Sequence, residues 1–395
     1  MDNKVKCEKI IYDIANILTI RNNNFSSGIL GELGGTMLFY SYCDRYFDND
    51  AFIKANKDRC VDRVLFYLAD NELIDFSYAF GISGLLFAIN ILDKEKFIEI
   101  DMSEAYEKYD PVLNSHMQIM AENSNLDFFY GAIGIGFYFL SRNNDQSYKM
   151  ISSLVDILEL KIIKDKDRYW YTYPLTDNKP NISLSHGMTS VAIFLSFVVK
   201  KGINKAKALR ILQGLMKYIL SQKVDFNENR CCYPSTFKGH THSNRSRLAW
   251  CYGDLGIALA FWHASQVTGI SEWKQESLRI LELSALRKEF GETGIYDAPV
   301  CHGIAGVAQI FRRMYFETNK SLFAETNRYW ISELLKIGDN EGGFSFYNPI
   351  ENKFNQCDYS LLEGLSGIGL VLLSSISHKY FSSWDNSLLL SHLFV

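Results

Sequence analysis

Residues 131–140 read GAIGIGFYFL, and this stretch decides the fold. It opens with Gly-x-x-Gly and continues as an apolar run. The chain carries the pattern seven times, with Ser190 in place of the second glycine in the fourth copy. Such self-similarity indicates a repeat architecture in which each copy is one supersecondary unit. The leading glycines of the copies are Gly31, Gly81, Gly131, Gly187, Gly253, Gly303 and Gly364.

The spacing between copies sets the size of the repeating unit. Successive leading glycines are 50, 50, 56, 66, 50 and 61 residues apart. About 50 residues accommodate two helices of four to five turns and their connections. The intervening segments, such as 51–71 and 146–160, have apolar residues three and four apart, which predicts amphipathic helices. The glycine-led runs are more uniformly apolar, so each unit should pair a buried inner helix with an amphipathic outer helix.

The ends of the chain favour closure of these units into a ring. An open stack of hairpins needs polar caps, and the last copy is as apolar as the middle ones. We therefore predict an all-α fold, an α/α toroid of seven inner and seven outer helices, as one domain over residues 1–395. Aromatic and polar segments with turn residues predict short rim hairpins or ordered loops at 167–181, 229–247 and 341–355.

The composition excludes several classes of protein. Apolar residues make up 47% of the 395 residues, which excludes a disordered chain. A formal charge of −4 gives no basis for binding nucleic acid or an anionic membrane surface. Neither a signal peptide nor a transmembrane segment is visible. The eight cysteines are scattered, unlike a disulfide framework, so we expect a cytoplasmic protein.

Reactive side chains collect just before the later glycine motifs. Cys251 and Cys301 stand two residues before their leading glycines, and His302 follows Cys301. Because equivalent positions of a ring converge on one mouth, we expect these three side chains to lie together. Two thiolates and one imidazole, with a fourth position open, are typical of a catalytic zinc site, so we predict one zinc ion per chain. The alternative is that both cysteines are merely small buried residues.

Two further residues suit acid–base chemistry. His186 stands directly before Gly187, in the slot that His302 occupies in the sixth copy. Asp127 lies four residues before Gly131 in an otherwise apolar stretch. We predict a catalytic role for both, although His186 could be a satisfied loop residue and Asp127 an N-cap.

Three segments carry a family resemblance: SHGMTS at 185–190, RLAWCYGDLG at 247–256 and CHG at 301–303. Together they resemble the signature motifs of the lanthionine synthetase C family, the lanthipeptide cyclases. The resemblance covers essentially the whole chain and implies an α/α toroid of the stand-alone class I type. It implies zinc ligands at Cys251, Cys301 and His302, and catalytic-site roles for His186, Asp127, Arg247 and Tyr252.

The resemblance also implies a reaction and its partners. The cyclase would add cysteine thiolates of a dehydrated precursor, a leader plus core peptide, to dehydroalanine or dehydrobutyrine. This intramolecular Michael addition forms lanthionine or methyllanthionine thioether rings. Expected partners are a dehydratase and an export transporter, so peripheral association with a membrane-bound biosynthetic complex stays open.

Three alternatives remain at this stage. A glycosidase or polysaccharide lyase would use paired carboxylates, for which Asp127 and Glu363 are available. A zinc-dependent thiol alkyltransferase would activate glutathione or act with an isoprenoid through the same sulfur chemistry. A non-catalytic scaffold would hold zinc and a peptide without turnover.

Overall fold

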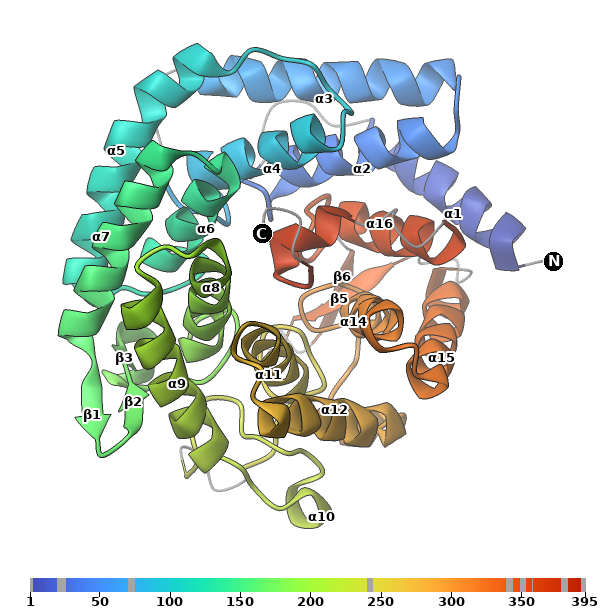
Figure 1. Ribbon diagram of the computed structural model, residues 1–395. Helices are drawn as coiled ribbons and strands as arrows, with labels where there is room; N and C mark the ends of the chain where they lie inside the picture. The colour runs from blue at the N-terminus through green and yellow to red at the C-terminus, as the bar shows by residue number, and fades with distance from the viewer. Residues whose placement is uncertain are drawn as a thin grey trace. The chain divides into compact units, whose positions relative to one another are not determined.

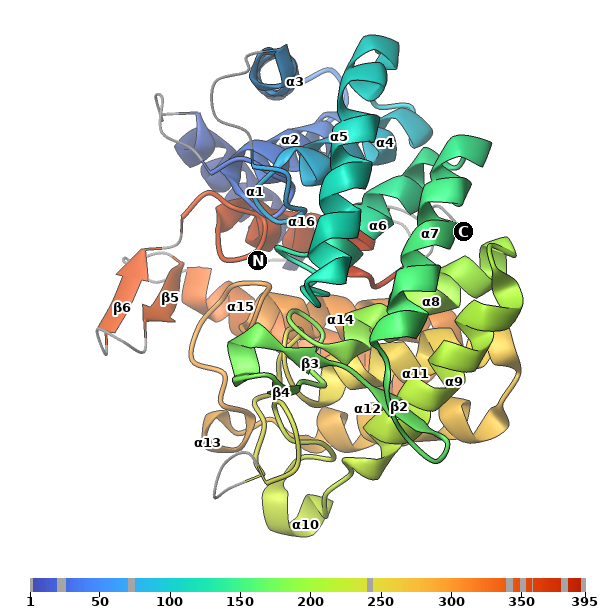
Figure 2. The same cartoon turned by 90° about the vertical axis from the view of Figure 1, so that its left-hand side faces the viewer.

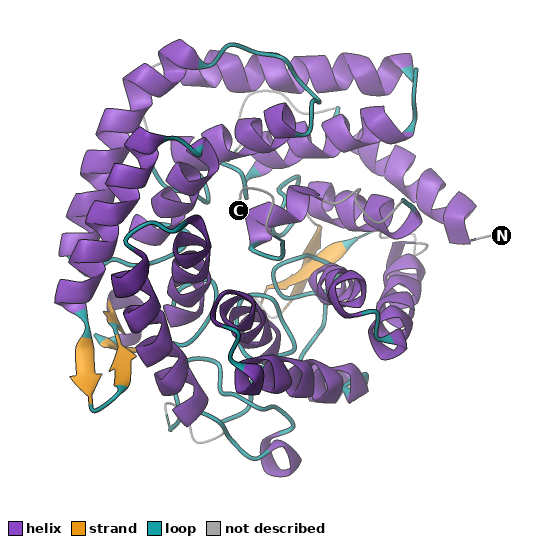
Figure 3. Ribbon diagram, in the orientation of Figure 1, coloured by secondary structure: helices purple, strands orange, loops and turns teal. Residues whose placement is uncertain are grey.

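Helices make up most of the computed structural model, which describes residues 3–19, 26–69, 75–239, 244–338, 344–348, 353–356, 358–377 and 383–391 (Figure 3). The chain divides into two units. The first combines Met1–Asp75, Ala79–Tyr106 and Ile295–Ser391, and the second combines Phe76–Tyr78, Glu107–Gly294 and His392–Val395. The single domain expected over 1–395 stays a prediction.

Every leading glycine is the N-cap of a buried helix, as the sequence predicted. Nearly all residues of these inner helices are buried, because their apolar side chains point in all directions. Within the described residues there are seven such helices: α2 (Glu32–Tyr46), α4 (Ile82–Lys94), α6 (Ala132–Arg142), α8 (Met188–Lys201), α11 (Asp254–Thr268), α14 (Ile304–Thr318) and α16 (Leu365–Ile376).

The second glycine of the motif has a steric reason. A Cβ at Gly134 or Gly306 would overlap the carbonyl oxygen of Phe128 or Val300, each three residues before the leading glycine of its copy. The missing side chain therefore allows a close approach to the loop of the same copy. That loop folds back onto the first turn of its inner helix.

In the first unit, the outer helices are α1 (Asn3–Leu18), α3 (Ala51–Ala69) and α15 (Ser321–Gly338). Helix α3 packs on α2, and α15 packs on α14. The last inner helix, α16, takes its outer partner from the start of the chain, since α1 packs against it (Figure 1). The 3₁₀ helix η2 (Ser383–Leu388) then packs on α4.

In the second unit, α7 (Asp145–Lys161), α9 (Lys205–Ser221) and α12 (Ser271–Leu286) cover the inner helices α6, α8 and α11. Helix α8 packs between α6 and α11 (Figure 1). Most of α5 (Ser103–Glu122) and the short helices α10 (Phe226–Asn229) and α13 (Phe290–Thr293) also belong to this unit.

Two of the three rim segments form antiparallel hairpins. The first segment holds β2 (Arg168–Trp170), which pairs with β1 (Ile163–Asp165) just before the segment (Figure 1). It also holds β3 (Thr172–Tyr173), which pairs with β4 (Lys179–Pro180) around η1 (Pro174–Thr176) (Figure 2). The last holds β5 (Ser345–Asn348) with β6 (Lys353–Gln356). Segment 229–247 is an ordered loop without strands where it is described, at 229–239 and 244–247.

Among the described helices, none has the length and apolar character needed to cross a membrane.

Candidate active site

The loops before the inner helices share one architecture in five copies. The first residue of each helix donates its backbone N–H to the carbonyl of the residue six before the leading glycine, at 2.7–3.0 Å. An aspartate or asparagine occupies that position each time, and several close an Asx turn with their side chains. These residues are Asp75, Asn125, Asn181, Asp297 and Asp358.

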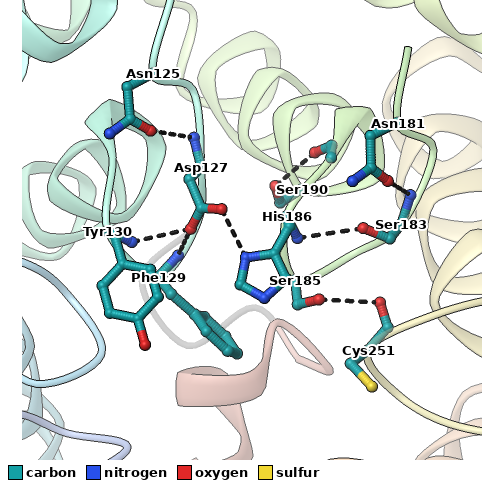
Figure 4. A network of polar contacts seen from close by, with 11 residues as sticks. Asn125, Asp127, Phe129, Tyr130, Asn181, Ser183, Ser185, His186, Ser190 and Cys251 are labelled. Atoms are coloured by element: carbon teal, nitrogen blue, oxygen red, sulfur yellow. Dashed lines mark hydrogen bonds and ion pairs between the residues drawn. The ribbon is translucent and has the colours of Figure 1, made fainter. Parts of the chain in front are cut away.

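Asp127 and His186 meet in the second unit. Oδ2 of Asp127 lies 2.6 Å from Nδ1 of His186 (Figure 4). Oδ1 of the same carboxylate accepts the backbone N–H groups of Phe129 at 2.6 Å and Tyr130 at 2.9 Å. Asp127 therefore caps its own loop, whereas the N-cap of α6 is Gly131, and it orients the imidazole of the next loop. Its catalytic role stays a prediction. With Nδ1 bonded to a carboxylate, Nε2 is the imidazole nitrogen available for proton transfer.

Aromatic side chains surround the His186 ring. Phe129 meets it edge-on at 4.9 Å between centroids, and Tyr130 stacks parallel to it at 6.4 Å. The ring of Tyr252 lies 6.1 Å away, so the structure brings Tyr252 to His186. Tyr130 is 47% exposed, whereas Asp127 is buried and His186 is half-buried. The imidazole thus stands at the border between core and surface.

Cys251 is tied directly to the loop that carries His186. Its carbonyl oxygen accepts the N–H groups of Leu184 at 2.9 Å and Ser185 at 3.2 Å. The hydroxyl of Ser185 donates to the same oxygen at 3.3 Å (Figure 4). These hydrogen bonds fix one predicted zinc ligand relative to the Asp127–His186 pair inside a single unit. Sequence reasoning missed Ser185, although it stands in the same slot as Cys251 and Cys301.

The loop of the fifth copy differs from the five that share one architecture. The residue six before Gly253 is the half-buried Arg247 rather than an aspartate or asparagine. Gly253 has φ +80, a conformation that only glycine adopts easily, and a Cβ there would lie 2.5 Å from the Ser246 hydroxyl oxygen. The backbone N–H of Leu248 bonds to the carbonyl of Thr293 at 2.7 Å, next to α13.

The first unit carries the other two predicted ligands. Cys301 is buried, and its N–H donates to the carbonyl of Leu362 at 2.9 Å. Nε2 of His302 lies 3.1 Å from Oδ2 of the buried Asp297, and its Nδ1 lies 3.9 Å from Oε1 of Glu363. Burial raises the pKa of the Glu363 carboxyl, while the charge of His302 acts to lower it.

Asp297 is a second residue that sequence reasoning missed. A carboxylate that accepts one N–H of an imidazole leaves the other nitrogen as the metal-binding atom, an arrangement found around most metal-ligating histidines. The signal was present in the repeat, because Asp297 occupies the Asx position of its loop, six residues before Gly303.

Cys231 and Cys232 are buried side chains of the rim loop. Burial raises the pKa of the Cys231 thiol, and that of Cys232 to about 12, which disfavours metal-binding thiolates. His240 and His242, which the sequence places near them, lie outside the described residues.

Comparison with known proteins adds family information. Residues 19–389 match the family described as lanthionine synthetase C-like protein. The nisin biosynthesis protein NisC of Lactococcus lactis subsp. lactis is 23% identical over 377 residues, covering 87% of this chain and 84% of that protein. The solved structure of nisin cyclase superposes with a TM-score of 0.73 at 20% identity, covering 98% of this chain and 97% of that one. This likeness confirms the predicted fold class, the all-α toroid.

Proposed function

Because the chain belongs to the lanthionine synthetase C-like family, a family of thioether-forming cyclases, we propose that it closes thioether rings in a dehydrated precursor peptide. The observation that carries the proposal is the Asp127–His186 pair, at 2.6 Å, joined through Ser185 to Cys251. It provides an oriented proton donor beside a cysteine that is itself a candidate metal ligand.

One zinc ion per chain would be held by Cys251, Cys301 and His302. Two thiolates and an imidazole form a zinc donor set, and both cysteines are buried while His302 is half-buried. Asp297 supports this assignment, since it holds Nε2 of His302 and orients Nδ1 for the metal. When bound, zinc would lower the pKa of the substrate cysteine thiol and keep it as a thiolate.

The chain's own residues would complete the addition. The substrate sulfur forms a bond to the β-carbon of dehydroalanine or dehydrobutyrine, and an electron pair moves to the enolate oxygen. Arg247 would stabilise that oxygen, and protonated His186 would return a proton to the α-carbon. The proton lost by the thiol is thereby balanced. Asp127 would hold His186 in the orientation and tautomer that this transfer requires.

Partners and location follow from this proposal. The substrate is the dehydrated precursor, with its leader and core, so a dehydratase must act beforehand and an exporter afterwards. A cytoplasmic location, with peripheral association to such a complex, fits a reaction that consumes a newly made peptide.

The test uses a synthetic peptide that carries one cysteine and one dehydroalanine. Ring closure leaves the mass unchanged but consumes the free thiol, so alkylation followed by mass spectrometry measures turnover. We expect about one zinc per chain by metal analysis, and loss of both zinc and ring closure in Cys301→Ala. Cys7→Ala is the matched control, because Cys7 is a buried thiol on α1.

Other outcomes would select the alternatives. A wild-type chain that closes rings without zinc overturns the metal assignment. Stoichiometric binding of zinc and peptide without turnover would indicate a scaffold. Alkylation of glutathione without activity on the peptide would indicate a thiol alkyltransferase. The glycosidase alternative has lost support, because both carboxylate oxygens of Asp127 already hold His186 and two backbone N–H groups.

A further inference from the structure

A buried ion pair involves Asp254, which stands three residues after the proposed metal ligand Cys251 in the sequence. Asp254, the first residue of α11, is fully buried, and Arg287, the C-cap of α12, is 2% exposed. Nη1 of Arg287 lies 3.5 Å from Oδ2 of Asp254. Two charges removed from water lose hydration energy that their mutual attraction repays only in part, so such a pair is a poor source of stability.

The pair joins three segments of the second unit. Oδ1 of Asp254 accepts the backbone N–H groups of Cys232 and Tyr233, each at 2.9 Å. Nη2 of Arg287 donates to the carbonyls of Ser246 and Glu292, each at 2.8 Å. These hydrogen bonds fasten three segments to the start of α11. They are the rim loop at 229–239, the segment that begins at Ser246, and the turn of α13.

These hydrogen bonds from outside replace the closure of the loop on itself that five other copies show. In five copies, an aspartate or asparagine and a backbone hydrogen bond close the loop before the inner helix. In the fifth copy, Arg247 occupies that position, so the segment 246–253 is held from outside, through Ser246 by Arg287 and through Leu248 by Thr293. The side chain of Arg247 cannot form the Asx turn that an aspartate or asparagine forms at this position.

We propose that Asp254 and Arg287 are positioning residues of the cyclase. They hold segment 246–253 so that the Cys251 thiolate and the Arg247 guanidinium keep the geometry needed for zinc and substrate. The inference rests on the proposed function, because it assumes that Cys251 binds zinc. It assigns neither residue a contact with the substrate.

A second buried ion pair provides the matched control. In the first unit, Asp385 of η2 is fully buried and accepts Nη2 of Arg313 at 2.8 Å. The carboxylate also accepts the side chains of Gln309 and Ser391 at 2.8 and 2.7 Å. These contacts fasten η2 to α14, and all of their residues lie outside the loops that carry the proposed site residues.

The experiment compares Asp254→Asn with Asp385→Asn by zinc affinity, measured by competition with a chromophoric chelator in the absence of peptide. Both variants should melt at a lower temperature than the wild type. Only Asp254→Asn should bind zinc more weakly, by roughly 10- to 100-fold, the usual effect of losing a group that supports a metal ligand. Arg287→Lys should weaken zinc binding in the same direction, because the shorter lysine lacks the planar fork that meets Asp254 and both carbonyls at once.

The outcomes separate this inference from the proposed function. Wild-type zinc affinity in Asp254→Asn and Arg287→Lys overturns the positioning role, while zinc and ring closure in the wild type leave the cyclase proposal standing. If Asp254→Asn fails to fold, Arg287→Lys decides. A wild-type chain without zinc affinity overturns both the metal assignment and this inference.

Discussion

The loops before α8 and α11 occupy equivalent places in the same unit and are built in opposite ways. In the first, Asn181 closes the loop through its own side chain and carbonyl, and Gly187 has φ −146. In the second, Arg247 takes the equivalent position, Gly253 has φ +80, and hydrogen bonds from outside hold the loop.

The difference shows that one position of the repeat can change its side chain without loss of the fold, because other contacts hold the loop. In the loop before α8, the polar side chain of Asn181 bonds to the loop's own backbone, and His186 is the residue left for the proposed site. A loop held from outside does not depend on an Asx turn, so Arg247 can stand at the position that an asparagine or aspartate takes elsewhere. The cost is a glycine-only backbone conformation and a buried ion pair, and both are open to mutation.

The largest expected effect comes from breaking the contact between Asp127 and His186, which links two neighbouring loops. Asp127→Asn should lower kcat on the cysteine–dehydroalanine peptide about 1,000-fold with little loss of stability, because the amide cannot hold the tautomer of His186. Asp225→Asn is the control, since Asp225 caps α10 with similar backbone contacts but no histidine. Equal activity in the two variants would mean that His186 needs no carboxylate.

Substitution at the equivalent position of the two loops should have opposite consequences. Arg247→Met should reduce kcat about 100-fold and change the melting temperature little, because a guanidinium for the enolate is lost. Asn181→Ala should leave kcat nearly intact but cost about 1–2 kcal/mol, since a buried Asx turn is removed. Thermal melts and turnover of both variants decide; a stability loss in Arg247→Met matching that of Asn181→Ala contradicts the comparison.

The backbone of the fifth loop predicts an intermediate effect. Gly253→Ala should destabilise the chain by about 2 kcal/mol more than Gly269→Ala, measured by urea denaturation. Both glycines have positive φ, at +80 and +71, but only at Gly253 would a Cβ lie 2.5 Å from the Ser246 hydroxyl oxygen. Similar losses in the two variants would show that the loop can relax around the new methyl group.

The smallest expected effect is a pH dependence of stability that arises from Glu276, which bonds to Tyr233 of the loop at 229–239. Glu276 accepts the Tyr233 hydroxyl at 2.9 Å. Burial raises its pKa, but hydrogen bonds from Arg279 and Lys223 outweigh burial and lower the pKa to about 2, from 4.5. The stability that the ionised carboxylate contributes is therefore full above pH 4.5 and lost as the pH falls toward 2.

Glu276→Gln should accordingly cost about 1 kcal/mol near neutral pH, a modest value because Arg279 and Lys223 are partly exposed. The difference from the wild type should shrink as the pH is lowered through the acid range. Urea denaturation at neutral and acidic pH measures it. A difference that stays constant with pH would show that the charge of Glu276 contributes nothing.

The sequence by itself determined the repeat, the start of every inner helix, the outer helices α3 and α7, and the slots that hold Cys251, Cys301, His302 and His186. These follow from glycine spacing and apolar periodicity, which act locally and recur. Only the tertiary structure decided that α1 is the outer partner of α16, that Asp127 bonds His186, and that Arg287 fastens the Arg247 loop. Each of these depends on residues that are distant in the sequence, and the packing of helices, which no local pattern encodes, brings them within hydrogen-bonding distance.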